Sequence, residues 1–352
     1  MRKRLRDLGC NIGQLPTGLN NAITDVPGVM VGHKTIIEDD PEVIRTGVTI
    51  ISPRGKNSWE DYCFGGLHVM NGHGEVTGIS WLNESGMLCN PIAITNTFGV
   101  GAVHEAMQHY TKPGFGLPIV AETYDGYLND RLNNHVKAID VKDALANLKS
   151  GKIDEGNVGG GTGMICHGFK GGVGTSSRIV NCDEGEYTVG VLVQSNYGKR
   201  EYLNINGIPV GQMLDGDVVP VPELIGNEKS SIVLIVATNA PMLPDHCRRL
   251  AQRASLAVGK CGGGDSNGSG DFSLAFSTYN HLPYDDKVHE LKSIAHISIN
   301  PFLVATIEVA EEAIVNALTM AETMVGFDNK KVHAIPLDRL EQILNKYNFE
   351  DA

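Results

Sequence analysis

The chain has 352 residues, of which 41 are Asp or Glu and 29 are Lys or Arg, so its formal net charge is −12. This acidic balance argues against a nucleic-acid partner and against binding to anionic membranes. With 41% hydrophobic residues, 20% charged residues and 42 glycines, the chain can form a large packed core and does not belong to the disordered class.

The predicted elements begin with a basic N-terminal cluster. The opening residues, MRKRLRDLGCNIGQL, have no apolar stretch after this cluster, so we expect no secretory signal. No run of about eighteen apolar residues follows, so we expect no transmembrane helix and a soluble, cytoplasmic protein. The seven cysteines are scattered and form no CxxC pair, which argues against a disulfide framework and a zinc cluster.

Short strand-like runs alternate with helical patterns along the chain. Strands are predicted over 29–33, 47–52, 76–82, 92–97, 117–122, 187–194, 231–238 and 272–278. The run at 231–238 is apolar on both faces, so we expect it at the centre of a sheet. The most linker-like stretch, PVPELIGNEKSS, comes directly before it.

Helical periodicity is clearest in five segments. Helices are predicted after Gly101, over 141–148, over 247–254, over 302–324 and over 337–347. Asp140 is expected to cap the second of these, and Gly151 to follow its end. The mixture predicts an α/β (α+β) fold with layered, largely antiparallel sheets between helices, and one compact domain over 1–352.

Several short motifs match known sites without the context that those sites need. Gly264-Asp265-Ser266-Asn267-Gly268 fits GxSxG, but the nucleophile elbow needs a strand before the serine and a helix after it. The glycine-rich stretch 159–163 lacks the GK[ST] ending of a phosphate loop, and 168–178 is better interpreted as a structural turn. His104 and His109 are five apart, not four as in HExxH, so we expect no metal and no cofactor.

Ser231 lies where a polar segment meets the predicted central strand. If the peptide bond before it were cut, Ser231 would gain a free α-amine with an ordinary pKa of about 7.7–8.0, next to its own hydroxyl. Nucleophile and general base would then belong to one residue. From the local sequence alone, the first residue of a buried strand is the favoured interpretation.

Long blocks of the chain, in order, resemble one known family. LNNAITDVPGVMVGH, PIVAETYDGYLND, NVGGGTGMICHGFKGGVGTSSR, YTVGVLVQSNYGKRE, SIVLIVATNAPMLP and NGSGDFSLAFST are similar to blocks of the DmpA-type L-aminopeptidase D-esterase/amidase family, which includes β-peptidyl aminopeptidases. The resemblance implies an αββα-like fold, similar to N-terminal-nucleophile (Ntn) hydrolases in appearance but not in chain order, and shared with ornithine acetyltransferases. It also implies a self-processing serine aminopeptidase or amidase that hydrolyses peptides, amides or esters with a free amino group. No cofactor is implied, and several αβ units are expected to form a homo-oligomer.

The resemblance also implies where the chain would be cut. Family members cut themselves before a serine, which corresponds to the Ser230-Ser231 bond here. The products would be an α segment, 1–230, and a β segment, 231–352, with 352 − 231 + 1 = 122 residues. The NGSGD block implies that Ser269 and Asp271 orient the amine and hydroxyl of Ser231.

Three further site residues are implied in the same way. The block VQSNYG supplies Asn196 as the donor to the oxyanion. The block AETYDG supplies Glu122, which would pair with the substrate ammonium group, and Tyr124, which would help to hold the reacting group. Without the resemblance, a strand-end turn would be the simpler interpretation of Asn196 and a surface salt bridge that of Glu122.

The chain departs from the family pattern at two positions. The family usually has glycine before the nucleophile, whereas this chain has Ser230, which tolerates strained backbone angles less well and could slow or prevent cutting. Some relatives carry glutamate where this chain has the shorter Asp271. Three alternatives therefore stay open: an ornithine-acetyltransferase-like acyltransferase, an uncut non-catalytic binding protein, and an α/β-hydrolase that uses Ser266.

Overall fold

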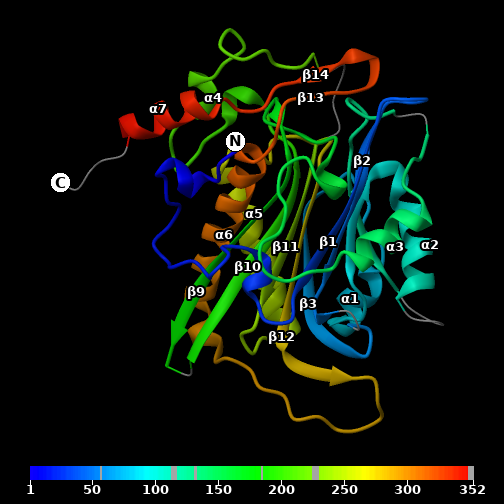
Figure 1. Ribbon diagram of the computed structural model, residues 1–352. Helices are drawn as coiled ribbons and strands as arrows, with labels where there is room; N and C mark the ends of the chain where they lie inside the picture. Colours follow the sequence, from blue (N-terminus) through cyan, green and yellow to red (C-terminus); the bar gives the residue numbers. More distant parts are fainter. Residues whose placement is uncertain (56–57, 112–116, 131–132, 184, 224–229, 348–352) are drawn as a thin grey trace.

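In the computed structural model, two β-sheets pack face to face, and helices cover their outer faces (Figure 1). The structure describes residues 1–55, 58–111, 117–130, 133–183, 185–223 and 230–347. Most of the predicted polar segment before Ser231, residues 224–229, lies outside this range. Within the described residues, no helix has the length and apolar character needed to cross a membrane.

The smaller sheet has the strand order β1-β2-β5-β6. Its strands are β1 (Met30–Glu38), β2 (Ile44–Ser52), β5 (Ile92–Asn96) and β6 (Ile119–Thr123). The first two pairings are antiparallel, whereas β5 and β6 run parallel. The carboxyl ends of β5 and β6 therefore lie next to each other, and the residues that follow the two strands lie at the same end of the sheet.

The larger sheet has the order β4-β3-β12-β11-β10-β9. Its strands are β3 (Asp61–Gly72), β4 (Met87–Leu88), β9 (Gly172–Cys182), β10 (Gly185–Asn196), β11 (Ser231–Thr238) and β12 (Gly270–Pro283). Among these pairings only β11 and β12 run parallel. Helix α5 (Pro244–Lys260) connects them, as a parallel crossover requires.

Three apolar layers separate the elements. One hydrophobic cluster fills the space between the two sheets, with Val233, Ile235 and Phe272 from the larger sheet and Ile92 and Ile94 from the smaller one. A second cluster lies between the larger sheet and helices α5 and α6 (Asn300–Thr319). A third lies between the smaller sheet and helices α2 (Val100–Tyr110) and α3 (Ala138–Ala146). Because β11 has an apolar layer on each side, all eight of its residues are buried.

The remaining elements are short or peripheral. The helices are α1 (Ile79–Ser85), α4 (Val210–Met213) and α7 (Leu337–Tyr347). Two hairpins are formed by β7–β8 (Ile165–Cys166 and Phe169–Lys170) and β13–β14 (Met324–Val325 and Lys331–Val332). The 3₁₀ turns in the described part of the chain are η1 (Leu5–Leu8), η2 (Ile23–Asp25), η4 (Thr97–Gly99), η5 (Gly159–Gly161), η6 (Arg200–Tyr202), η7 (His296–Ile299) and η8 (Phe327–Asn329). The β7–β8 hairpin lies beside the end of β10.

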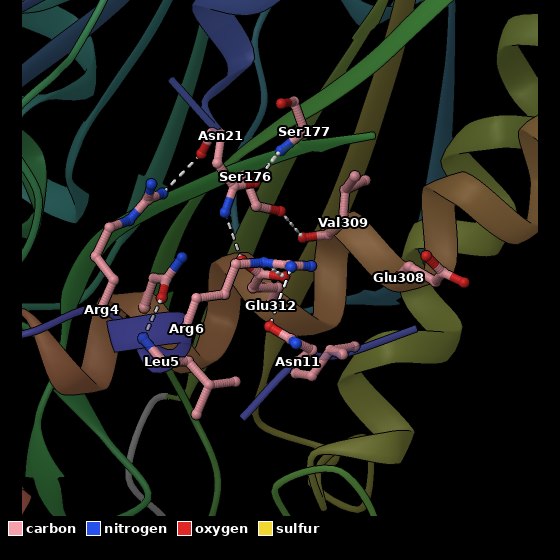
Figure 2. A network of polar contacts seen from close by, with 12 residues as sticks. Arg4, Leu5, Arg6, Asn11, Asn21, Ser176, Ser177, Glu308, Val309 and Glu312 are labelled. Carbon is pink, nitrogen blue, oxygen red and sulfur yellow. Dashed lines mark hydrogen bonds and ion pairs between the residues drawn. The ribbon is translucent and has the colours of Figure 1, made fainter. Parts of the chain in front are cut away.

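A network of polar contacts fastens the N-terminal segment to α6 and β9 (Figure 2). Arg6 Nε lies 2.9 Å from Glu312 Oε1, and Arg178 Nη2 lies 2.6 Å from Glu312 Oε2. Arg178 and Glu312 are both buried, so each of these two charges is compensated by the other inside the protein. Leu5 N donates to Asn316 Oδ1 across 3.0 Å, which holds η1 against the same helix.

The structure confirms the predicted layering, the central strand 231–238 and the helices α2, α3, α5, α6 and α7. Three predictions are wrong. Residues 76–82, predicted as a strand, form a turn and the start of α1. The segment 168–178, predicted as a turn, forms β8 and most of β9. A Cβ on Gly174 would lie 2.0 Å from Ala313 O, so glycine there lets α6 pack closely on the strand.

The third wrong prediction concerns the cap of α3. The N-cap residue is Lys137, and Asp140 lies three positions later, where its Oδ2 accepts a hydrogen bond of 2.8 Å from Lys137 N. The carboxylate therefore still satisfies a backbone donor at the N-terminus of the helix, but from the first turn. The helix predicted over 302–324 also ends earlier, at Thr319.

Candidate active site

Ser231 is the first residue of β11 and lies between the ends of two neighbouring strands. Its Cα pairs with that of Asn196 on β10 and that of Gly270 on β12. The residue is only 4% exposed, and the Tyr124 N–H approaches its Oγ at 3.4 Å. The hydroxyl of Ser231 therefore lies at the N-terminal end of a buried central strand, beside the residues that follow β6 of the other sheet.

Asn196 ends β10 directly across from Ser231. Its Oδ1 accepts a hydrogen bond of 2.9 Å from Ile165 N. Since a backbone N–H can only donate, the atom facing Ile165 must be the amide oxygen, which fixes the orientation of the side chain. The side chain is 7% exposed. The bond from Ile165 N therefore holds the Asn196 amide in one orientation, which is what an oxyanion donor would require.

Ser269 and Asp271 flank Gly270 at the start of β12. Ser269 Oγ donates to Asp271 Oδ1 across 2.5 Å, and both side chains are buried. Burial raises the pKa of the Asp271 carboxyl, while the bond from Ser269 and a backbone contact with Ile232 lower it in part. The charge of Asp271 therefore depends on donors placed around it.

The turn after β3 covers this pair. His73 N donates to Ser269 O across 3.1 Å, and Asn71 Nδ2 donates to the same carbonyl oxygen. A Cβ on Gly74 would lie 3.0 Å from Glu122 Oε1 and 3.2 Å from Gly270 Cα, so only glycine fits here without a shift of its neighbours. Nothing in the local sequence marks Asn71, His73 or Gly74 as site residues, because the register of β3 against β12 brings them to Ser269.

Glu122 lies in β6 and is buried, with an exposed fraction of 5%. Its Oε1 accepts a hydrogen bond of 3.2 Å from Glu75 N, and its Oε2 accepts one from Thr97 Oγ1. Thr97 follows β5, and the parallel pairing of β5 with β6 places it beside Glu122. Thr97 is predicted only as the last residue of the strand 92–97, because the local sequence does not show the strand pairing that brings it to Glu122.

Tyr124 follows β6 and lies between Glu122 and Ser231. Its backbone N–H points to Ser231 Oγ, and its ring meets that of Phe98 edge-on, with centroids 6.4 Å apart. The structure thus brings the implied residues Glu122, Tyr124, Asn196 and Ser231 to the facing ends of two sheets, together with Ser269 and Asp271. Ser230 precedes them, and its carbonyl oxygen accepts a hydrogen bond of 3.0 Å from Gly270 N.

The competing motifs lie in contexts that do not support their chemistry. Ser266 lies in the loop between α5 and β12, so a helix precedes it and a strand follows it, the reverse of a nucleophile elbow. In the stretch 159–163, Gly159 N and Gly160 N donate to Thr35 Oγ1 and Thr49 Oγ1, at 2.8 and 3.1 Å. These amide donors therefore serve packing inside the fold and do not face a phosphate.

Two groups of side chains within the described ranges have metal-ligand spacing. One consists of Asp245, His246 and His296, and the other of Glu42, Asp130 and His135. In the first group Arg249 Nη1 lies 3.3 Å from His296 Nε2, which places a positive charge where a metal would bind. In the second, His135 Nε2 lies 3.2 Å from Asp130 Oδ2, as in a hydrogen-bonded pair. Neither group contains a residue of the Ser231 site.

Comparisons with known proteins show which family the chain belongs to. The sequence model described as Peptidase family S58 matches residues 21–332. Across an alignment of 369 positions, the chain is 42% identical to a β-peptidyl aminopeptidase of Sphingosinicella microcystinivorans, and the alignment covers 98% of this chain and 92% of that protein. The similarity thus extends across nearly the whole of both sequences.

Solved structures show the same relationship. A β-aminopeptidase of Burkholderia sp. superposes with a TM-score of 0.92 at 45% identity, over 99% of this chain and 100% of that one. The L-aminopeptidase D-Ala-esterase/amidase of Ochrobactrum anthropi, described as a prototype of the serine aminopeptidases and a variant of the Ntn-hydrolase fold, superposes with a TM-score of 0.90 at 40% identity, over 98% of each chain. The chain therefore has this variant Ntn-hydrolase fold, belongs to peptidase family S58, and is a hydrolase of the aminopeptidase or amidase type.

Proposed function

We propose that this hydrolase processes itself at the Ser230-Ser231 bond and then uses the N-terminal Ser231 as its nucleophile. The observation that carries the proposal is the position of Ser231 Oγ at the start of a buried strand. It lies across from Asn196 and next to the Ser269–Asp271 pair. The cut would divide one compact domain, 1–352, into segments 1–230 and 231–352, held together by the shared larger sheet.

The first stage is an N→O acyl shift. Ser231 Oγ attacks the carbonyl carbon of Ser230, the bond from that carbon to Ser231 N breaks, and the nitrogen takes up the hydroxyl proton to become a free amine. Water then hydrolyses the resulting ester, which releases the Ser230 carboxylate and regenerates the Ser231 hydroxyl. The Gly270 N–H at 3.0 Å from Ser230 O supports this step, because it donates to the oxygen on which negative charge develops.

The second stage is the hydrolysis of substrate. The Ser231 amine, with an ordinary pKa of about 7.7–8.0, takes the proton from its own hydroxyl as Oγ attacks the substrate carbonyl. Asn196 donates to the oxyanion, and Ser269 and Asp271 orient the amine. The leaving group departs with the proton, and water hydrolyses the acyl ester.

The substrate class follows from Glu122. A buried carboxylate near the nucleophile is a suitable partner for an ammonium group, and Thr97 and Glu75 N hold it in place. We therefore propose peptides, amides or esters with a free amino group. The β-peptides named for the Sphingosinicella relative and the D-Ala esters and amides named for the Ochrobactrum relative are the first to assay.

Two further proposals come from the sequence. We propose that several αβ units assemble into a homo-oligomer, which size-exclusion chromatography with light scattering tests. We also propose a cytoplasmic location, which the scattered cysteines without a CxxC pair support and which cell fractionation tests.

Mass spectrometry of purified protein tests the main proposal. The expected result is a 122-residue fragment that begins at Ser231, together with amidase activity. Ser231→Ala should remain uncut and inactive, while the matched variant Ser266→Ala should be cut and active. An intact native chain without activity would support the non-catalytic alternative. Loss of activity in Ser266→Ala but not in Ser231→Ala would support the α/β-hydrolase alternative, in which Ser266 is the nucleophile.

A further inference from the structure

Lys170 is a fully buried cation in the β7–β8 hairpin. Its Nζ lies 2.8 Å from Met164 O, 2.8 Å from Gly171 O and 3.4 Å from Gly161 O. Among the described residues, no carboxylate forms an ion pair with it. Burial lowers the pKa of its ammonium group to about 7. Its three N–H donors therefore each serve one carbonyl oxygen, which partly offsets the cost of burying the charge.

The three carbonyls belong to the turns on either side of the hairpin. Gly161 and Met164 lie in the turn that leads into Ile165, and Lys170 is itself the cross-strand partner of Ile165. Gly171 N donates to Met164 O as well, at 2.9 Å. The lysine side chain thus fastens the turn before Ile165 to the strand opposite Ile165.

Ile165 in turn holds a residue of the active site. Its N–H donates to Asn196 Oδ1 across 2.9 Å, and this bond sets the direction of the Asn196 amide across from Ser231. The hairpin is also bonded to the residue after β10, because His167 N donates to Tyr197 O across 2.7 Å. A shift of the 161–165 turn would therefore move the donor that orients Asn196.

We propose that Lys170 is a positioning residue for acyl transfer, which holds the 161–165 turn so that the Ile165 N–H orients the Asn196 amide. This inference rests on the proposed function, in which Asn196 donates to the oxyanion. An apolar side chain of similar length would fill the same space without the cost of a buried charge. The use of lysine is explained by its three donors and not by its volume.

A double-mutant cycle tests the proposal. We would measure kcat and KM for Lys170→Met, Asn196→Ala and the double variant, all per mole of the fragment that begins at Ser231. Lys199→Met is the matched control, because Lys199 lies three residues after Asn196 but its side chain is 60% exposed and pairs with Asp265. For a variant that folds but is cut too slowly to give enough of this fragment, the fraction cut after a fixed time replaces kcat.

The expected result separates positioning from a purely structural role. Lys170→Met should lower kcat by about 10- to 100-fold with little change in KM, because a misplaced donor acts mainly in the transition state. In the Asn196→Ala background the same change should cost less than about 3-fold, since the group through which it acts is already absent. Lys199→Met should retain native kcat.

Two outcomes overturn different claims. If Asn196→Ala lowers kcat but Lys170→Met leaves it unchanged or reduces it by the same factor in both backgrounds, Lys170 does not act through Asn196. If Asn196→Ala itself leaves kcat unchanged, the oxyanion role in the proposed function fails. A lower melting temperature in Lys170→Met without the kcat effect would also count against positioning.

The intact lysine provides a second measurement if Lys170→Met does not fold. Above neutral pH the ammonium group loses one proton, which leaves two donors for three carbonyls. The ratio of native kcat to Asn196→Ala kcat should therefore fall by about 3-fold or more between about pH 7 and 9, because the Ser231 amine affects both proteins alike. The neighbouring Cys166 has a pKa of about 12, and burial lowers the pKa of His333 below its usual value, so neither changes charge in this range. Arg200, near the same hairpin, has a pKa of about 10 and keeps its charge over most of this range. A ratio that is independent of pH would overturn the proposal.

Discussion

Ser269 and Asp271 are joined by a hydrogen bond of 2.5 Å between Oγ and Oδ1, at the start of the strand that runs parallel to the nucleophile strand. In the proposed mechanism this pair orients the Ser231 amine. Asp271→Asn replaces a charged acceptor by a neutral amide, so we expect kcat to fall about 10²-fold, in the range typical of groups that assist proton transfer. Steady-state kinetics on the cut protein measures this.

Two companion variants make the result specific. Asp271→Glu keeps the charge with one more methylene and should retain more activity than Asp271→Asn. Ser273 is the next buried polar residue on the same face of β12, and its Oγ lies 3.2 Å from Ser255 Oγ. Ser273→Ala should leave kcat near the native value. Equal losses in Asp271→Asn and Ser273→Ala would indicate a damaged strand and not a role for the carboxylate.

Ser230→Gly restores the residue that precedes the nucleophile in the resembled family. Glycine reaches strained backbone angles at lower cost than serine, so we expect the precursor to be cut faster, by about 2- to 5-fold for a difference of about 0.5–1 kcal/mol. The rate is read from the appearance of the 122-residue fragment on gels after synthesis. A slower cut in the glycine variant would mean that the Ser230 side chain takes part in the reaction.

Glu122→Gln removes the charge that we assign to ammonium recognition. A charge-assisted hydrogen bond contributes about 1.5–3 kcal/mol, so kcat/KM for substrates with a free amine should fall about 10- to 100-fold. The matched control is Glu75→Gln, because the Glu75 side chain is exposed and its backbone N–H still reaches Glu122. If N-acetylated substrates were hydrolysed as well as free amines by the native protein, the assignment would be wrong.

Asp125 predicts a pH dependence of stability. It is buried, and burial raises its pKa from 3.8 to about 7, although contacts with the side chains of Thr46, Asn129 and Asn96 lower the pKa in part. Below pH 3.8 the folded and unfolded chains are both protonated. As pH rises towards about 7, the unfolded chain ionises first and the folded state loses up to about 4 kcal/mol, a loss that is complete above pH 7.

Asp125→Asn should remove this loss. The melting temperature of the variant minus that of the native protein should therefore increase as pH rises from about 4 to 8. Asp217→Asn makes the same substitution at an exposed aspartate and should show no such trend. A difference for Asp125→Asn that is constant across this range would contradict the assigned titration.

Glu312→Ala tests the N-terminal network shown in Figure 2. The variant would remove the carboxylate at 2.6 Å from the fully buried Arg178, which would keep only Glu308 Oε2 at 3.1 Å as a carboxylate partner among the described residues, and would also remove the partner of Arg6. Breaking one side of a buried pair typically costs about 3–5 kcal/mol, so thermal melting should show a large loss of stability. Glu341→Ala, which removes a surface partner of Lys3 at 3.9 Å, should cost less than about 1 kcal/mol.

Much of the fold could be predicted from local patterns. The run 231–238 is apolar at every position but its ends, and a segment of that kind can be stable only between two apolar layers, where β11 lies. Helices α2, α5 and α7 were predicted from one apolar face each. The errors arose where local pattern and packing disagree: the glycines of 168–178 suggest a turn, yet Gly172 and Gly174 are strand residues that allow other backbone segments to approach closely.

The sequence by itself determined the layers and the family resemblance, and it suggested the six site residues that the resemblance implies, because these depend on residue type and order. Only the tertiary structure decided that Thr97, Gly74 and Ile165 surround them, and that Lys170 connects to Asn196 through a backbone N–H. Such contacts depend on strand register and on the meeting of chain segments distant in sequence. Neither is encoded in the spacing of any single motif.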